Sequence, residues 1–228
     1  MSSQYELEGV GKAFVRGSVV INAVADVDLT IEQGEFVALE GPSGSGKTTL
    51  LQLLGALDRP SSGRVRFEDR DLAGLPDGEL DELRLRSFGF VFQQFNLIPT
   101  LTALENVQAK LAPTGLSDDE LQRRSEALLD EVGLGDRASH LPSHLSGGEQ
   151  QRVAIARALS VEPHVILADE PTGNLDTKTG ADIIETLADL AARRGTTIIV
   201  ATHDVDLADR APRRLAMRDG RLRALVAV

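Results

Sequence analysis

The sequence predicts an α/β fold with a mainly parallel sheet, an N-terminal antiparallel β region and an inserted helical subdomain. An apolar strand, a helix with one apolar face and a second apolar strand follow one another over residues 164–201. This order favours parallel pairing with right-handed crossovers. Residues 5–40 combine strand spacing with β-branched content, whereas residues 94–160 show helical periodicity and almost no strand signal.

The N-terminal part is expected to be rich in strands, with a turn at 32–35 before the third one. A Gly-rich loop at 41–46 then opens a helix whose leucines are spaced for burial on most sides. These leucines are Leu50, Leu51, Leu53, Leu54 and Leu57. The expected strands cover 5–10, 24–31, 36–40, 65–67 and 88–92, and a polar, exposed helix is expected at 77–86.

The helical subdomain is expected to interrupt the α/β core. Proline and glycine residues divide its pattern into separate helices at 104–111, 121–132 and 153–159. We therefore expect residues 1–228 to form one domain. Its core would be residues 1–93 and 161–228, and its insertion residues 94–160.

The C-terminal end has the signal of a tight hairpin, because Asp219-Gly220 separates two short strand-like stretches at 214–218 and 221–226. Arginines are frequent in this region. Contact with anionic lipid or a membrane partner is one role for them, but a solvated hairpin face is the expected one.

Composition excludes several classes of protein. No apolar run approaches the roughly 20 residues that cross a bilayer, and the first residues lack the basic start and apolar stretch of an export signal. We therefore expect a cytoplasmic protein. The absence of cysteine excludes disulfides and thiol catalysis. The net charge of -11 argues against direct, indiscriminate binding of nucleic acid, which needs a basic face.

Residues 41–48, Gly-Pro-Ser-Gly-Ser-Gly-Lys-Thr, satisfy the phosphate-loop pattern G-x-x-x-x-G-K-[ST] between a strand and a helix. The glycines let backbone N–H groups converge on a phosphate, Lys47 neutralises β- and γ-oxygens, and the Thr48 hydroxyl is a ligand for Mg²⁺. A dinucleotide site is less well supported, because the third glycine of G-x-G-x-x-G is absent. The expected nucleotide-binding residues are Gly41, Ser43, Gly44, Ser45, Gly46, Lys47, Thr48 and Thr49.

An acidic pair, Asp169 and Glu170, ends the apolar strand that begins near residue 165. The carboxyl ends of strands are where open α/β sheets bind ligands. Asp169 suits the outer shell of Mg²⁺, and Glu170 is placed to polarise a water in line with a γ-phosphate. Taken alone, such a pair is better explained by helix capping or salt bridges, but beside the phosphate loop the nucleotide role is favoured.

Three more polar residues are expected near the same edge. Gln93 ends an apolar strand and, being neutral, suits a bond to Mg²⁺ or its water and to a moving partner; Gln94 competes for this role. His203 ends another strand, within expected reach of a γ-phosphate oxygen. Asp176 follows the acidic pair by a short loop and is expected to face an interface, to cap the next helix, or both.

Residues 145–152, Leu-Ser-Gly-Gly-Glu-Gln-Gln-Arg, form a second expected phosphate-binding surface. Ser146, Gly147 and Gly148 offer a hydroxyl and backbone N–H groups at an expected helix N-terminus, where the peptide dipoles favour an anion. Because this surface lies far from residues 41–48 in the sequence, two copies of the chain are expected to face each other and complete each other's sites.

With these motifs identified, the chain resembles the ATP-binding subunits of ABC transporters over essentially its whole length. The resemblance implies a RecA-like P-loop NTPase core. It also implies that an aromatic side chain stacks on adenine, and Phe14 is similar in position to the usual Tyr, the alternative being a core Phe. The matching motifs are Walker A (41–48), the Q-loop (Gln93), the signature (145–150), Walker B (165–170), the D-loop (174–176) and the switch histidine (His203).

The resemblance implies an ATPase that binds ATP and Mg²⁺ and closes as a homodimer around two ATP molecules. It implies catalytic roles for Glu170, His203, Gln93 and Lys47, and metal contacts by Thr48, Gln93 and Asp169. The implied partner is a separate integral membrane permease. The protein would then lie at the cytoplasmic face of the cell membrane and contact the membrane only through that permease.

Residues 92–99 and 171–176 are similar to the subgroup that serves lipoprotein release, macrolide export, peptide-antibiotic resistance and septum-linked FtsE-type complexes. One alternative is a regulatory ATPase of the same family that transmits mechanical signals without moving cargo. A soluble ABC ATPase acting on nucleic acid or ribosomes is less favoured, because no coiled-coil insertion, zinc element or tandem ATPase domain is present in the sequence.

Overall fold

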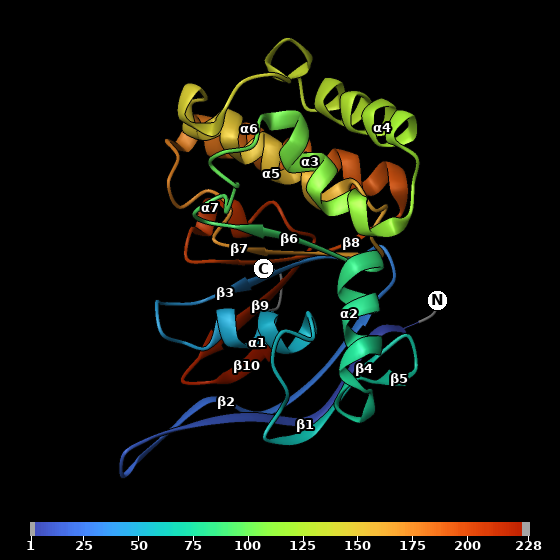
Figure 1. The fold of residues 1–228 in the computed structure, drawn as a ribbon. Helices are drawn as coiled ribbons and strands as arrows, with labels where there is room; N and C mark the ends of the chain where they lie inside the picture. Colours follow the sequence, from blue (N-terminus) through green and yellow to red (C-terminus); the bar gives the residue numbers. More distant parts are fainter. Residues whose placement is uncertain (1–2, 225–228) are drawn as a thin grey trace. The chain divides into compact units, whose positions relative to one another are not determined.

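The computed structural model describes residues 3–224, which form two compact units (Figure 1). The first unit takes the chain up to Asp81 and again from Gly195 onward, and the second takes Glu82–Arg194. The expected insertion, residues 94–160, lies wholly within the second unit. Its boundaries as a subdomain remain a prediction.

An antiparallel sheet occupies the N-terminal part of the first unit. Its strands are β1 (Ser3–Arg16), β2 (Val19–Glu32), β4 (Ser62–Phe67) and β5 (Arg70–Asp71), in the order β2-β1-β4-β5. β1 and β2 form the long hairpin drawn in blue in Figure 1. Both strands exceed the predicted ranges, because the outer part of the hairpin is exposed and lacks the alternation of a half-buried strand.

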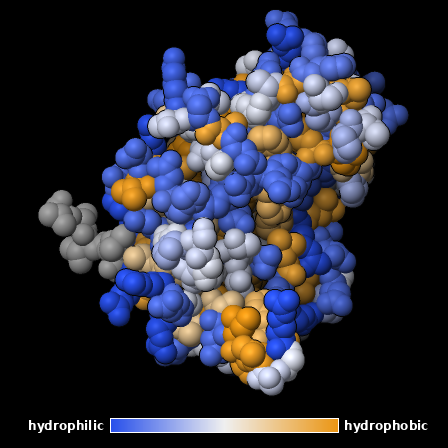
Figure 2. All heavy atoms as spheres, turned by 90° about the vertical axis from the view of Figure 1, so that its left-hand side faces the viewer, coloured by the Kyte–Doolittle hydropathy of each residue, from blue (hydrophilic) through white to orange (hydrophobic). Residues whose placement is uncertain are grey.

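The outer part of this hairpin carries apolar side chains at the surface. Figure 2 shows apolar surface gathered at the lower end of the view, among mostly hydrophilic neighbours. The exposed apolar residues of the hairpin are Phe14, Val15, Val19, Val20 and Ile21.

The second sheet region of the first unit is centred on β3 (Phe36–Glu40). β3 pairs in parallel with β8 (Thr197–Thr202) on one side and β9 (Arg213–Arg218) on the other, and β10 (Arg221–Ala224) pairs antiparallel with β9. The predicted C-terminal hairpin is therefore present. Residues 225 and 226 of its expected second strand lie outside the described residues.

The sequence predicted a solvated hairpin face for the C-terminal arginines. In the structure, two of these arginines are held in ion pairs. Arg213 pairs with Glu35 at 2.9 Å, and Arg214 pairs with Glu40 at 2.6 Å and also with Asp209. These pairs fix β9 to β3 and to the segment after β8.

Helix α1 (Lys47–Leu54) follows β3, and α7 (Val205–Ala208) follows β8. The α1 leucines 50, 51, 53 and 54 are buried as expected. The expectation for Leu57 was wrong, since its side chain is 48% exposed. The helix ends at Leu54, and Ala56 then takes a left-handed conformation with φ 52°, which turns the chain before Leu57.

Helix α2 (Asp77–Arg86) leads into the second unit, where β6 (Phe88–Phe92) and β7 (Val165–Asp169) pair in parallel. The long helices of this unit lie together in Figure 1. They are α3 (Ala103–Leu111), α4 (Asp118–Glu131), α5 (Gly147–Leu159) and α6 (Thr177–Arg194). Short 3-10 helices cover Leu72–Gly74, Ala112–Thr114, Gly135–Arg137 and Pro142–His144.

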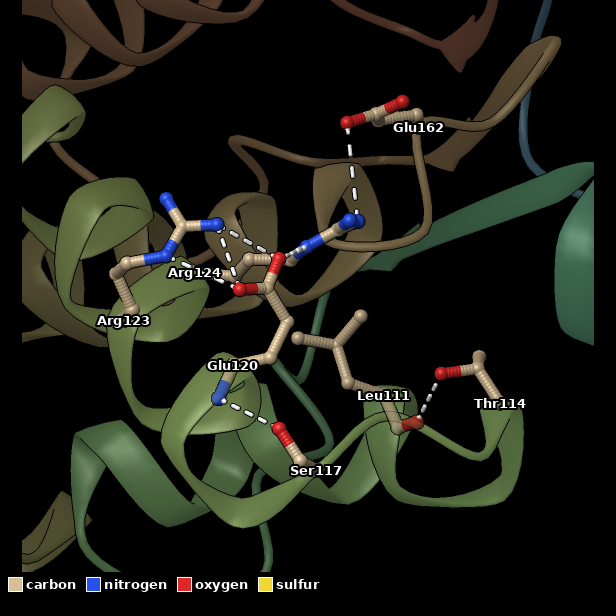
Figure 3. A network of polar contacts seen from close by, with 7 residues as sticks. All are labelled: Leu111, Thr114, Ser117, Glu120, Arg123, Arg124 and Glu162. Atoms are coloured by element: carbon tan, nitrogen blue, oxygen red, sulfur yellow. Dashed lines mark hydrogen bonds and ion pairs between the residues drawn. The ribbon is translucent and has the colours of Figure 1, made fainter.

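Local capping explains where these helices begin. Thr102 and Glu105 form a reciprocal capping box at α3, as Ser146 and Glu149 do at α5. Figure 3 shows the start of α4, where the Ser117 hydroxyl accepts from the Glu120 N–H. The Glu120 carboxylate in turn accepts from the guanidinium groups of Arg123 and Arg124.

The predicted fold class is confirmed, since the chain combines an antiparallel N-terminal sheet, parallel strand pairs and helices. Across residues 3–224, no helix has both the length and the apolar character needed to span a bilayer.

Candidate functional site

The phosphate loop of the first unit curls tightly between β3 and α1. Gly44 and Gly46 have φ angles of 79° and 107°, a region that favours glycine. The Ser45 N–H donates to the Pro42 carbonyl at 3.2 Å, which closes the loop. Gly46 precedes α1 and provides no side-chain cap for it. A helix start without a side-chain cap is a common place for an anion to bind.

Lys47 and Ser45 fit a phosphate ligand. The Lys47 side chain is buried, and its ammonium group donates to the Gly41 carbonyl at 2.6 Å and to the Pro42 carbonyl at 3.3 Å. The Ser45 hydroxyl is buried and makes no hydrogen bond to any residue in the described range. A buried polar group of this kind calls for a partner, and phosphate oxygens would provide one. Thr48 is exposed and Thr49 is partly buried.

The β9–β10 hairpin packs against this loop and forms a hydrogen bond with it, a contact that the sequence did not predict. A Cβ atom on Gly41 would lie 3.2 Å from the Met217 carbonyl carbon and closer still to its oxygen. The Gly220 N–H donates to the Ser45 carbonyl at 3.0 Å, and the Gly220 carbonyl accepts from the Ala25 N–H at 2.8 Å. The hairpin thus connects the phosphate loop to β2.

The first unit also places His203 beside the phosphate loop. In the parallel pairing of β3 and β8, Glu40 lies opposite Thr202. The next residues, Gly41 and His203, therefore leave neighbouring strands at the same edge. The His203 side chain is exposed.

Phe14 lies on β1 opposite Ile21, and its side chain is 41% exposed, so it does not occupy a core position. The Lys12 ammonium lies 5.2 Å from the centroid of its ring. Lys12 lies over one face of this ring, and a partly exposed aromatic ring can stack on a planar ligand through its other face.

In the second unit, the parallel pairing of β6 and β7 sets Phe92 opposite Asp169. Gln93 and Glu170 are therefore the residues that leave these two neighbouring strands. Asp169 and Glu170 are both partly buried. Glu170 has a φ of 48°, a left-handed conformation that is uncommon for a residue with a side chain and that often marks functional sites.

Gln93 lies against the loop that follows Glu170. Its side-chain amide donates to the Asn174 side-chain oxygen at 3.4 Å, and the Asn174 amide donates to the Gln93 carbonyl at 2.8 Å. A Cβ atom on Gly173 would lie 2.7 Å from the Gln93 amide nitrogen. The position of Gln93 at a strand end was predicted from the sequence, whereas its pairing with Asn174 was not.

Residues 146–148 start α5, as expected. The Ser146 hydroxyl accepts from the Glu149 N–H at 3.3 Å, while the Glu149 carboxylate accepts from the Ser146 N–H at 2.8 Å. The hydrogen bond from the Ser146 N–H lowers the pKa of the Glu149 carboxyl, and the Ser146 side chain lowers it further. A Cβ atom on Gly148 would lie 2.6 Å from the Thr179 methyl group. The start of α5 therefore packs closely against the first turn of α6.

Asp176 caps α6. One of its carboxylate oxygens accepts from the Thr179 N–H at 3.0 Å and the other from the Thr179 hydroxyl at 2.6 Å. These two bonds lower the pKa of the exposed Asp176 carboxyl. The capping role considered for this residue is present in the structure, and its role at an interface stays a prediction.

Arg157 fixes the segment that follows Gln93, a contact that no pattern in the sequence predicted. Its guanidinium donates to the Phe95 carbonyl at 2.8 Å and to the Asn96 carbonyl at 2.6 Å. Phe95 and Asn96 both have left-handed φ angles, 58° and 51°. Burial lowers the pKa of the Arg157 guanidinium. The helix that begins with residues 146–148 thus also holds the loop that begins at Gln93.

Comparison with known proteins identifies the family. Residues 24–173 match the family model described as ABC transporter. The chain belongs to the ABC transporter family. Within that family it is an ATP-binding domain, with the ATPase activity that defines such domains.

Several relatives of the family match nearly the whole chain. An uncharacterized ABC transporter ATP-binding protein of Thermotoga maritima is 48% identical over 99% of this chain and 96% of its own length. The lipoprotein-releasing system ATP-binding protein LolD of Syntrophus aciditrophicus is 46% identical over 95% of this chain and 97% of its own length. The macrolide export ATP-binding/permease protein MacB of Marinobacter nauticus is 49% identical over 95% of this chain, which spans only 34% of that longer protein.

Solved structures of the family share the fold. The ATP-binding cassette MJ0796, in a dimeric post-hydrolysis state bound to ADP and Pi, is 43% identical with a TM-score of 0.89. The match covers 98% of this chain and 100% of that one. A second dimeric structure of the same cassette gives the same TM-score at 44% identity.

Proposed function

We propose that this chain hydrolyses ATP as a homodimer and drives a separate membrane permease of the lipoprotein-release or macrolide-export type. The observation that carries the proposal is the phosphate loop, where a buried Lys47 ammonium and a buried Ser45 hydroxyl lie at a helix start without a side-chain cap. The relatives named LolD and MacB support the type of permease.

On this proposal, the phosphate loop holds the triphosphate through its backbone N–H groups and Lys47, and Phe14 stacks on the adenine. Thr48, Gln93 and Asp169 would hold Mg²⁺, which neutralises phosphate charge when it is bound. Lys47 is buried and its ammonium already lies at the loop, which favours its assignment to the phosphates.

The hydrolytic step assigns the base to Glu170. Its carboxylate accepts a proton from a water molecule whose oxygen attacks the γ-phosphorus. The bond from the γ-phosphorus to the β–γ bridging oxygen breaks, which leaves ADP and inorganic phosphate. His203 donates a hydrogen bond to a γ-phosphate oxygen as charge develops there.

Hydrolysis is coupled to movement through a second copy of the chain. Ser146, Gly147 and Gly148 of one subunit cover the ATP held by the other, and Asp176 lies at the same interface. Loss of the γ-phosphate removes the link between subunits, so the dimer opens. The cycle moves a permease that prefers one of the two states, and the protein then works at the cytoplasmic face of the membrane. The dimeric cassettes of the family support this arrangement.

The central test is Glu170→Gln, which removes the base and keeps the shape of the side chain. Turnover is expected to fall about 10² to 10⁴-fold, with ATP affinity retained and with ATP-dependent dimers detected by light scattering. Glu162→Gln is the matched control, because Glu162 is an exposed carboxylate just before β7. Near-normal turnover in Glu170→Gln, or a strictly monomeric protein with saturating ATP, would overturn the proposal.

The permease assignment has its own test. Detergent extracts of cells that carry a tagged form of the chain should yield a permease with four membrane spans and a large external domain. Its addition in lipid vesicles should change the ATPase rate. Recovery of a nuclease or a ribosomal factor in place of a permease would contradict this part of the proposal and leave the ATPase itself intact.

A further inference from the structure

Gln151 is a buried glutamine on α5 whose side chain reaches the loop after β7. Its exposed fraction is 0%, and its amide donates to the Pro171 carbonyl at 2.7 Å. The acceptor is a backbone carbonyl, which requires an N–H donor, so this contact fixes the orientation of the amide. The amide oxygen is buried and has no hydrogen-bond partner within residues 3–224.

Pro171 directly follows Glu170, the residue with the left-handed φ of 48°. A residue before proline prefers extended conformations, so this geometry persists only where the surroundings impose it. Two hydrogen bonds hold the segment from both sides: Gln151 holds the Pro171 carbonyl, and the Gly173 N–H donates to the Glu170 carbonyl at 3.1 Å.

We propose that Gln151 is a positioning residue for Glu170. By holding the Pro171 carbonyl, its amide keeps the preceding peptide, and with it the Glu170 carboxylate, in the geometry that activates water. This inference rests on the proposed role of Glu170 as the base. Because Gln151 is fully buried, its proposed action on the base runs through the Pro171 carbonyl.

The position of Gln151 on α5 gives this contact a second consequence. Gln151 lies three residues after Gly148, within one helical turn of the surface proposed to cover the partner's ATP. A shift of α5 as it meets that nucleotide is therefore transmitted to the Glu170 loop of the same subunit. In each subunit, the position of Glu170 then depends on the nucleotide that residues 146–148 of the same subunit cover.

The test compares ATPase kinetics of Gln151→Met with those of Thr186→Val. Methionine keeps the length and volume of glutamine and lacks the N–H donor. Thr186 accepts a hydrogen bond at 3.2 Å from Arg152, the next residue on α5, and lies on α6 away from the Glu170 loop. Thr186→Val therefore removes a contact of the same helix without touching Pro171.

Gln151→Met is expected to lower kcat about 10- to 100-fold, as misplacement of a catalytic group by a fraction of an ångström to an ångström does. The KM and the Kd for ATP should change less than about threefold. Thr186→Val should leave all three unchanged. A purely structural role for Gln151 would instead lower stability and ATP affinity together, which thermal unfolding and a binding titration would detect.

A double-mutant cycle separates the two levels of the proposal. In the Glu170→Gln background, Gln151→Met should have no further effect on residual turnover, because the group that it positions is already gone. An equal fold loss in both backgrounds, or unchanged kcat in Gln151→Met alone, would overturn the positioning role. Near-normal turnover of Glu170→Gln would instead overturn the proposed function.

If Gln151→Met does not fold, Gln151→Asn takes its place in the same comparison. Asparagine keeps a buried amide but is one methylene shorter, so its amide nitrogen no longer reaches the Pro171 carbonyl at the native distance. Its kcat is expected to lie clearly below that of the wild type. A wild-type kcat would overturn the proposal.

Discussion

Gly46→Ala is the sharpest test of how the fold shapes the phosphate loop. Gly46 has φ 107° and ψ 1°, a conformation that is strained for alanine. An added Cβ would lie 2.8 Å from the Met217 terminal methyl and 3.3 Å from the Ala23 carbonyl carbon, closer still to the Ala23 oxygen. The Met217 methyl is the end of a flexible side chain, although it is buried, whereas the Ala23 atoms are backbone of β2 and cannot move aside without disturbing the strand.

Gly44 provides the reference for the magnitude. It also has a positive φ, 79°, but a Cβ there would meet nothing within 4 Å. Gly44→Ala should therefore cost only the backbone strain, about 1–2 kcal/mol. Gly46→Ala adds the clash with Ala23 to that strain and should cost about 4 kcal/mol or more. Gly78→Ala, in helix α2 and also without neighbours within 4 Å, should stabilise the protein by about 0.5–1 kcal/mol.

Urea unfolding followed by circular dichroism measures the three free energies of unfolding, and a titration measures ATP affinity. We expect Gly46→Ala to lose ATP binding even where it remains folded, since the loop must shift away from β2. Equal costs for Gly44→Ala and Gly46→Ala would show that the contact with Ala23 does not shape the loop. Full ATP affinity in Gly46→Ala would refute the reasoning altogether.

Two predictions concern polar groups that are not candidate site residues, the partly buried Lys110 and the fully buried Tyr5. Burial, with a smaller effect from Arg157, lowers the pKa of Lys110 to about 8. Above that pH the unfolded chain binds more protons than the folded chain, so the free energy of unfolding should rise between about pH 8 and 10. Urea unfolding at about pH 7.5 and 9.5 should show this rise in the wild type but not in Lys110→Met. The same change between the two pH values in both proteins would contradict the prediction. The Tyr5 hydroxyl, fully buried, donates to the Leu54 carbonyl at 2.9 Å. Tyr5→Phe should therefore cost about 1–2 kcal/mol without changing ATP affinity, and a loss of affinity would place Tyr5 in the binding machinery.

The sequence alone determined the features that depend on neighbouring residues. The phosphate loop, the apolar strands that precede Gly41 and Glu170, and the start of α5 at Ser146 follow from spacing and from hydrogen bonds three residues apart. Leu57 shows that spacing along the chain does not fix where a helix ends. Its spacing fits the buried face of α1, but the helix ends before it and the side chain is exposed.

Only the tertiary structure decided which distant segments hold the candidate site. Met217 lies behind the phosphate loop, Asn174 pairs with Gln93, and Gln151 holds the Pro171 carbonyl. No local pattern marks these partners, because a contact between residues 20 to 176 positions apart is set by how strands pair and helices pack. The roles of the site residues remain predictions from motifs, whereas the supports that hold these residues in place come from packing alone.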